Sequence, residues 1–355
     1  MSKLKTLATA LLAILVLAFK AQSQPAYNEE IKQAAVSFVN TLNPLQKKTA
    51  LLSFNDTARI KWNNLPVGLR ARAGMSIGSM SDEQRKLLHR ILSVSLSSQG
   101  YLKATGIFHL DNLLNMYYDS LFLNNKIDST RHRMMQNLKW SHQNYYLAFF
   151  GLPSDTMWGY KIEGHHLSVN FTFVKNKLSV TPFFIGTDPA EYPNTEYAGW
   201  RVLGQEEDLG IKLIHLLSAE QQKKATMSKD VPRDIITAAE SGIRLVDYWG
   251  IKGSEMTKEQ QAILQYIIRE FVFNLEYEKA IAEYDKILKA GINKIYFGWI
   301  GPYVENKPHY FILNGPAFII EFANNNGNHI HAIWREKGNE YGEDVLRQHY
   351  LLEKH

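Results

Sequence analysis

The sequence predicts an α+β fold in which one mixed β-sheet is assembled from two β-rich regions and flanked by helices. Residues 145–186 and 294–334 contain short β-forming runs bounded by turn residues. The intervening residues 206–290, and much of the first third of the chain, instead carry apolar side chains at three- and four-residue spacing. One sheet built from both β-rich regions is the most economical arrangement of these elements.

Helical spacing predicts helices at residues 28–42, 44–54, 82–98 and 111–123. Ser81, followed by Gln84, forms a capping box at the start of the third helix. A second box runs from Thr257 to Gln260 and opens a helix within residues 206–290. A closing helix is expected near residues 341–352.

Strands are expected where β-forming residues alternate between turn signals. The run 145–186 is divided by a turn at residues 175–177. The second region contains four runs, with a turn at residues 314–316. These four runs are residues 294–300, 309–313, 317–322 and 329–334. No internal repeat or linker is apparent, so residues 24–355 are expected to form a single α+β domain with a helical N-terminal part.

The first 23 residues have the pattern of a signal peptide. Lys3 and Lys5 precede a short apolar run, and Ala21 and Ser23 supply the small side chains that a signal peptidase requires. We therefore expect a periplasmic or secreted protein. No later stretch approaches the roughly 20 apolar residues of a membrane-spanning helix. The chain has no cysteine, so its stability cannot depend on disulfides.

Charge excludes some classes of partner. The formal net charge is +5, and cleavage after Ser23 lowers it by three, because the leader carries Lys3, Lys5 and Lys20 and no acid. Lys and Arg are interspersed with acids elsewhere, which argues against a nucleic-acid partner or a polybasic membrane patch.

Two histidine-containing segments are the best candidates for a functional site. In residues 163–172, read as a strand, alternation places His166, Ser168, Asn170 and Thr172 on one face. Short hydrogen-bonding groups beside an imidazole suit an ordered pocket wall. The competing interpretation is the solvent side of a half-buried sheet.

In the second segment, His329 and His331 stand two apart, so a strand presents both rings on one face. Two imidazoles can bind one divalent metal ion, and the nearest further candidates by type are His165, His166, Glu163, Glu321 and His349. We expect His166, His329 and His331 to converge in space. Zinc, copper and iron all accept such ligands, so the metal is not specified. The competing interpretation is a pair of hydrogen-bonded strand histidines.

A metal between these histidines would suit a hydrolase. Glu163 or Glu321 would accept a proton from the metal-bound water, and Arg335 would hold an anionic oxygen. For Glu321, a charged strand residue paired with Arg or Lys is the competing interpretation. A redox-active copper or iron would instead support an oxidoreductase.

The alternative is a non-catalytic protein that binds a small molecule or glycan. Trp158, Tyr160, Trp299 and Trp334 lie in the same β-rich stretches as the histidines, and aromatic rings beside short polar groups suit a sugar-like ligand. Ordinary core packing is the other explanation for these rings.

Several short strings together resemble a bacterial family catalogued as domain of unknown function 3500. The most specific are Gly164-His165-His166-Leu167-Ser168 and Asn328-His329-Ile330-His331, the latter followed by Trp334-Arg335. Further matching strings are Met157–Tyr160, Thr181–Phe184 and Asn314–Pro316. The resemblance covers most of the chain after the leader, and it implies a shared fold and site without an established activity.

Overall fold

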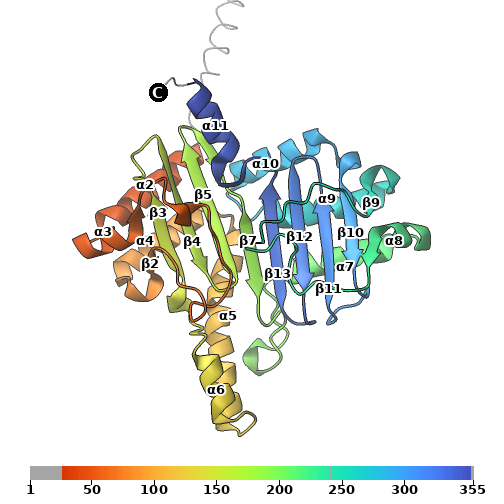
Figure 1. The fold of residues 1–355 in the computed structure, drawn as a ribbon, viewed down its shortest axis with the longest axis horizontal. Coiled ribbons are helices and arrows are strands. Elements are labelled where there is room, and N and C mark those ends of the chain that lie inside the picture. The colour runs from red at the N-terminus through yellow and green to blue at the C-terminus, as the bar shows by residue number, and fades with distance from the viewer. Residues whose placement is uncertain (1–25, 240, 353–355) are drawn as a thin grey trace, which may run out of the picture.

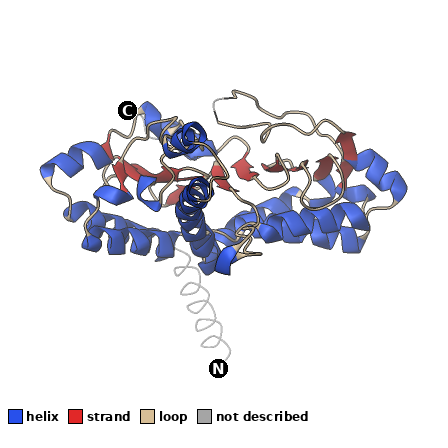
Figure 2. Cartoon of the chain, turned by 90° about the horizontal axis from the view of Figure 1, so that it is seen from below, coloured by secondary structure: helices blue, strands red, loops and turns tan. Residues whose placement is uncertain are grey.

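The computed structural model describes residues 26–239 and 241–352. The expected signal peptide, residues 1–23, lies outside the described residues. Within them, thirteen strands form a single mixed sheet. Helices cover one face of this sheet, and two long loops cross the other face (Figures 1 and 2). The predicted α+β class is therefore confirmed.

The first half of the chain supplies the sheet strands on one side. Its helices are α2 (Ala26–Asn40), α3 (Pro44–Ala50), α4 (Asp82–Ser95), α5 (Ser98–Leu123) and α6 (Ser129–Gln136). Its strands are β1 (Leu51–Leu52), β2 (Met75–Ser76), β3 (Tyr146–Phe150), β4 (Met157–Gly164), β5 (Leu167–Val174), β6 (Lys177–Ser179) and β7 (Phe183–Thr187).

The second half supplies the other side and the closing helix. Its helices are α7 (Gly204–Leu216), α8 (Ala219–Ala225), α9 (Lys258–Val272), α10 (Tyr277–Ala290) and α11 (Glu343–Leu352). Its strands are β8 (Thr226–Ser228), β9 (Ile251–Lys252), β10 (Tyr296–Ile300), β11 (His309–Asn314), β12 (Phe318–Asn324) and β13 (Ile330–Glu336).

The two halves repeat one architecture, although no repeat was expected from the sequence. The path β1-β3-β4-β5-β7 is continued by β13-β12-β11-β10-β8, so the second half follows the first in mirrored strand order. In each half, a strand of two or three residues after a short helix pairs in parallel with the outer long strand. The central strands β7 and β13 pair antiparallel, as an approximate twofold axis between them requires.

Equivalent capping boxes mark the same repeat. Asn43 with Gln46 begins α3, and Ser218 with Gln221 begins α8. The predicted boxes at Ser81 and Thr257 begin α4 and α9. Gln46 bonds the Gln84 side chain in the first half, and Gln221 bonds Gln260 in the second. The repeat is not apparent in the sequence, because equivalent positions carry chemically similar residues more often than identical ones.

Several predicted boundaries were wrong. The helix expected at 44–54 stops at Ala50, because Leu51 and Leu52 pair with β3. Helix α5 begins at Ser98, where the Ser97 hydroxyl caps the Gly100 amide, well before the expected residue 111. The expected helical stretch 206–290 is interrupted by the loop that leads into β9. Helix α6 was missed because it is polar and contributes no buried side chain.

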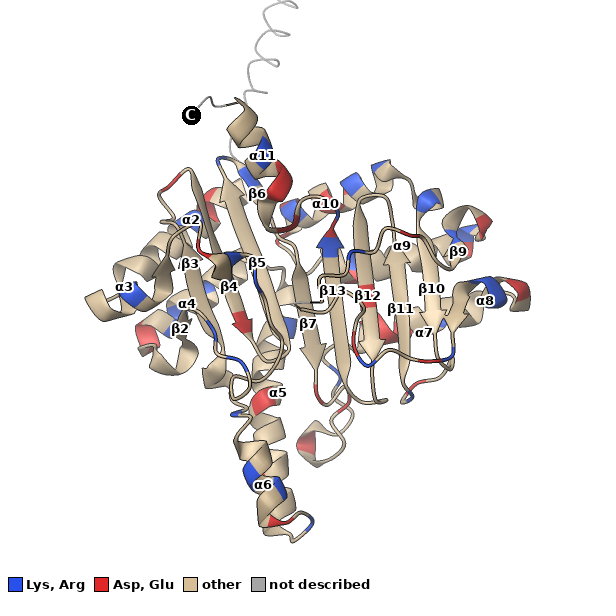
Figure 3. Cartoon of the chain, viewed as in Figure 1, with Lys and Arg blue, Asp and Glu red and all other residues tan. Residues whose placement is uncertain are grey.

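Both faces of the sheet are packed. The larger core joins the helices to inward residues such as Phe149, Ile162 and Ile320. A smaller core lies under the two loops and contains Trp62, Phe184 and other apolar residues of the central strands. Lys, Arg, Asp and Glu residues are all spread over the helices and loops (Figure 3). Among the described residues, no helix has the length and apolar character needed to cross a membrane.

Candidate metal centre

Three histidines meet at one end of the central strands. His166 lies in the two-residue turn between β4 and β5, and His329 directly precedes β13. His331 is on β13, where it pairs with Gly186 of β7. Residues 163–172 therefore form a hairpin rather than the single strand that was expected. The turn requires a left-handed backbone at His166, with φ of 62°, a conformation that is uncommon outside glycine.

The imidazole nitrogens of this group, which we call the histidine centre, are close together. The Nε2 atoms of His166 and His329 are 2.7 Å apart, and those of His329 and His331 are 3.1 Å apart. One ligand atom from each of the three residues falls within a common span of 4.8 Å. His166 and His331 are buried, whereas His329 is only partly buried. This arrangement could hold one metal ion and leaves one side open to solvent.

Carboxylates lie behind two of the three rings. The Nδ1 atom of His331 is 2.6 Å from Asp234, which leaves its Nε2 atom to face the other histidines. Asp188, just after β7, lies 3.8 Å from the Nδ1 atom of His329. A carboxylate behind a histidine is the usual support for a metal-binding imidazole, because it fixes the ring and the tautomer. Both acids were missed in the sequence, since each lies in a loop with no recognisable motif.

Gly186 provides the space in which the rings approach. A Cβ atom at this position would lie 2.9 Å from Cδ2 of His166 and 3.1 Å from Cδ2 of His331. It would also lie 2.7 Å from the carbonyl oxygen of Ile330 on the neighbouring strand. The two rings therefore pack over a bare stretch of β7 backbone that only glycine provides.

His165 faces a different partner. Its Nδ1 atom is 2.6 Å from Asp111 of α5, and its carbonyl oxygen accepts a hydrogen bond from the Tyr145 hydroxyl. Its ring still lies against His166, with centroids 3.7 Å apart. Asp111, His165 and His166 form a second buried group compatible with a metal ion. Of the four predicted ligands, the structure brings three together and places His165 beside them.

Burial keeps the central imidazoles neutral. Burial, with the nearby His331 and His165 acting in the same direction, lowers the pKa of His329 to about 2. Burial likewise places the pKa of His166 well below its usual value, with the neighbouring histidines acting in the same direction. A neutral imidazole has a free lone pair, so neither residue must lose a proton at neutral pH before it can bind a metal.

Glu163 and Glu321 were expected to act as bases, but their carboxylates are engaged elsewhere. Glu163 accepts the Asn63 amide at 2.5 Å and lies 3.4 Å from the Lys161 ammonium. Glu321 is fully buried in β12, where it accepts the amide of Ile236 and the hydroxyl of Tyr310. These donors satisfy its carboxylate, and among the described residues no Lys or Arg forms an ion pair with it.

Arg335 also lies away from the histidine centre, four residues farther along β13. Its guanidinium donates to both the hydroxyl and the carbonyl of Thr237 and to Glu340. Arg335 and Glu321 therefore hold the same loop segment, around Thr237, against the sheet. That segment follows Asp234, so these two residues help to fix the position of the acid behind His331.

The polar residues that follow the turn are buried. Ser168, Asn170 and Thr172 are each no more than 4% exposed, so this strand face is not a solvent face. The Asn170 amide donates to the carbonyl of Pro182, and the Ser168 hydroxyl donates to Glu163. These contacts hold the loop side of the sheet together and do not form the wall of a site at the histidines.

Residues 24–343 match the family described as protein of unknown function DUF3500. The chain belongs to this family. No curated protein and no solved structure matches this DUF3500 chain. Its function must therefore be argued from its own side chains.

Proposed function

We propose that this DUF3500 protein is an exported, metal-dependent hydrolase with His166, His329 and His331 as the metal ligands. The convergence of three Nε2 atoms, one of them backed by the Asp234 carboxylate, carries the proposal. Such an arrangement is unfavourable in a purely structural role, because three imidazoles direct their Nε2 atoms at one another in a largely buried space.

The site could bind zinc, copper or iron, because all three accept neutral nitrogen ligands. Three protein ligands leave one coordination position for water, which is the usual arrangement of a catalytic rather than a structural zinc site. The partial exposure of His329 supplies the open side. A bound divalent ion would lower the pKa of that water and make hydroxide available near neutral pH.

The protein residues have distinct roles in this proposal. Asp234 holds the His331 ring, and Asp188 lies behind His329. The Asn64 amide nitrogen lies 3.4 Å from Nε2 of His331 and covers the ring on the loop side. Glu163, Glu321 and Arg335 take no part in proton transfer. They hold the loops that carry these residues.

The aromatic residues on which the glycan-binding alternative was based are buried. Trp158, Tyr160, Trp299 and Trp334 are at most 3% exposed and belong to the core between helices and sheet. Trp158 stacks on Phe173 with centroids 4.2 Å apart, and Trp299 stacks on His309. Their rings stabilise the fold and are not available to a sugar.

Hydrolysis of model substrates by the metal-free and reloaded protein tests this function. Protein treated with a chelator would be reloaded with zinc, copper or iron and supplied with an activated ester, a phosphate monoester and an anilide. We expect one reloaded form to hydrolyse at least one substrate class. His329→Ala should abolish this activity, while the control His89→Ala, on the distant helix α4, should retain it.

Each other outcome has a clear meaning. Activity that survives both chelation and His329→Ala would contradict the hydrolase proposal and point to contamination. Stoichiometric metal binding without hydrolysis of any of the three substrates would also overturn the hydrolase, while it would leave the histidine centre as a metal site.

A further inference from the structure

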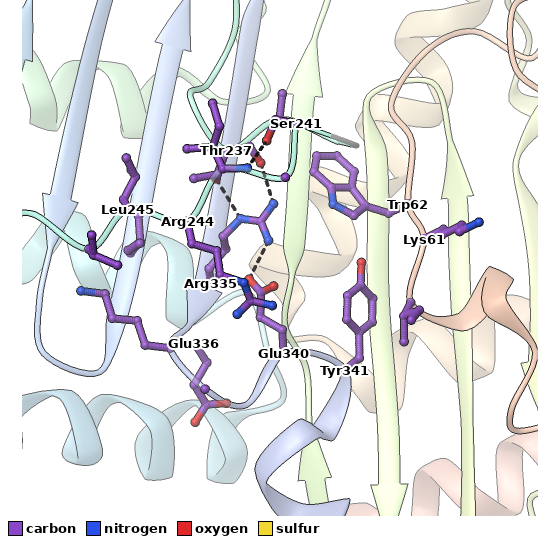
Figure 4. Close-up of a pocket in the computed structure, with 18 residues that line it drawn as sticks. Lys61, Trp62, Thr237, Ser241, Arg244, Leu245, Arg335, Glu336, Glu340 and Tyr341 are labelled. Atoms are coloured by element: carbon purple, nitrogen blue, oxygen red, sulfur yellow. Dashed lines mark hydrogen bonds and ion pairs between the residues drawn. The ribbon is translucent and has the colours of Figure 1, made fainter.

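A cavity lies on the same face of the sheet as His331. It has a volume of about 550 Å³ and lies between the first-half loop at Trp62 and the second-half loop at residues 241–246 (Figure 4). Arg335 and Ile319 form its floor on β13 and β12. We call it the loop-face pocket. Four residues of β13 separate Arg335 from His331, which is about 13 Å along a strand.

The loop-face pocket is separate from the histidine centre. Ile333 lies between His331 and Arg335 on the same face of β13 and is fully buried. Phe184, its partner on β7, is also fully buried and packs against Trp62. Since these apolar side chains fill the space between the two sites, a ligand of the pocket does not reach the metal ligands.

Tyr341 brings a buried, unpaired hydroxyl to this pocket. Its ring lies beside Trp62, with the hydroxyl directed toward the indole (Figure 4). That oxygen is buried and has no hydrogen-bond partner among the residues that the structure describes. A buried hydroxyl without a partner is unfavourable unless something else satisfies it. A ligand atom in the pocket is well placed to do so.

The backbone at Tyr341 is held in an uncommon conformation that directs this ring. Its φ is 53°, in the left-handed region that L side chains rarely adopt. The Tyr341 amide donates to the carbonyl of Thr181, and its own carbonyl accepts the Arg59 guanidinium. Such strain tends to occur at binding sites, where the surrounding structure enforces it.

The charges around the pocket favour an anion. Lys61 and Arg244 lie at its rim. Among the described residues, neither of them forms an ion pair with a carboxylate. The two acids of the wall are already engaged, since Glu340 accepts Arg335 and Glu336 is bound by Lys286 and Asn339. The remaining charge is positive, while Trp62 and Leu245 supply apolar surface.

We propose that the loop-face pocket binds a small aromatic carboxylate. Its ring packs against Trp62 and Leu245, and its carboxylate accepts a hydrogen bond from the Tyr341 hydroxyl, while Lys61 and Arg244 at the rim supply a positive field. This role is independent of the metal centre and requires no metal. Hydrogen bonds to a charged acceptor are stronger than those to a neutral one, so the carboxylate itself should decide affinity.

Calorimetry with two matched probes tests the proposal. 2-Naphthoate and the neutral 2-naphthamide have the same ring system, and both would be titrated into chelated protein. We expect 2-naphthoate to bind at least tenfold more tightly. Tyr341→Phe should weaken 2-naphthoate several-fold, and the double change Lys61→Gln with Arg244→Gln should weaken it about tenfold. Lys212→Gln, a change of an exposed lysine on α7, should leave the affinity unchanged.

A thermal melt of ligand-free Tyr341→Phe separates binding from a structural role. Because the hydroxyl has no partner in the ligand-free protein, its removal should leave the melting temperature unchanged or raise it. A lower melting temperature with unaltered 2-naphthoate affinity would overturn the proposal. So would an absence of 2-naphthoate binding, or equal affinity for the two probes.

Discussion

The Nδ1 atom of His331 lies 2.6 Å from the carboxylate of Asp234, a residue 97 positions earlier in a loop of the second half. This contact directs the opposite nitrogen of His331 toward His166 and His329. It also joins the loop face of the sheet to the histidine centre. The loop is in turn fixed by Glu321 and Arg335, the two strand residues that bind Thr237.

The first prediction concerns Asp234. Asp234→Asn keeps the size of the side chain but removes the charge that fixes the His331 tautomer, so zinc affinity should fall about 10- to 100-fold. Competition with a chromophoric chelator measures this affinity. Asp230→Asn, in the same loop, serves as the control. Equal zinc affinity for wild type and Asp234→Asn would show that Asp234 does not support a metal ligand.

The second prediction tests the space beneath the rings. Gly186→Ala introduces a methyl group against His166 and His331, which should abolish zinc binding and destabilise the protein by about 1–3 kcal/mol. Gly210→Ala is the matched control, because its Cβ would lie 2.4 Å from the Phe311 ring, at a different place in the fold. It should also destabilise the protein but leave zinc stoichiometry unchanged. Normal zinc binding by Gly186→Ala would contradict the packing described here.

The third prediction concerns the pH dependence of stability at Glu206. This residue of α7 is fully buried, 2.8 Å from the Lys103 ammonium, which also contacts Glu270. Burial raises the pKa of Glu206 above its ordinary value of 4.5, and this effect outweighs the opposing charge of Lys103. The folded state therefore holds this proton more tightly than the unfolded state.

It follows that the free energy of unfolding should decrease as pH rises from about 4.5 through the raised pKa of Glu206. Glu206→Gln cannot ionise, so its stability relative to wild type should increase with pH by up to about 1.4 kcal/mol per unit in that window. Urea unfolding at several pH values measures the difference. A difference that stays constant with pH would rule out ionisation of Glu206 as its source.

The fourth prediction is that export removes residues 1–23. Ala21 and Ser23 provide the small side chains recognised at such a cleavage site, so the mature protein should begin at Gln24. Intact-mass spectrometry of protein recovered from the periplasm or the medium measures this directly. Exported protein that retains Met1 would show that the leader is not cleaved.

Much of the fold could be predicted because the strongest signals are local. Apolar spacing and two capping boxes located α4 and α9, and β-forming runs located most of the central strands. The short strands β1 and β8 could not be predicted, since pairing with distant strands decides their conformation. The loop before β9 is held by Glu321 from the distant strand β12, which no local pattern reveals.

Part of the candidate site could likewise be predicted from a local sequence pattern. His329 and His331 stand two apart at the start of β13, so their common face follows from strand periodicity. Their approach to His166 depends on β5, β7 and β13 being neighbours, which is a property of the sheet. Asp234 and Asp188 come from loops, where sequence spacing carries no information about direction. Glu163 and Glu321 accept backbone amides from the loops, and residue type alone does not distinguish such carboxylates from catalytic ones.

The metal content of tag-free protein decides whether the histidine centre is a metal site. Elemental analysis of wild type, either as purified or after chelation and reloading with zinc, should give about one divalent ion per chain. The double variant His329→Ala with His331→Ala should contain none, while its chelated form should melt close to chelated wild type, because the pair serves the ion rather than the core. Metal-free wild type that takes up no zinc, or a double variant that binds as much as wild type, would contradict the account.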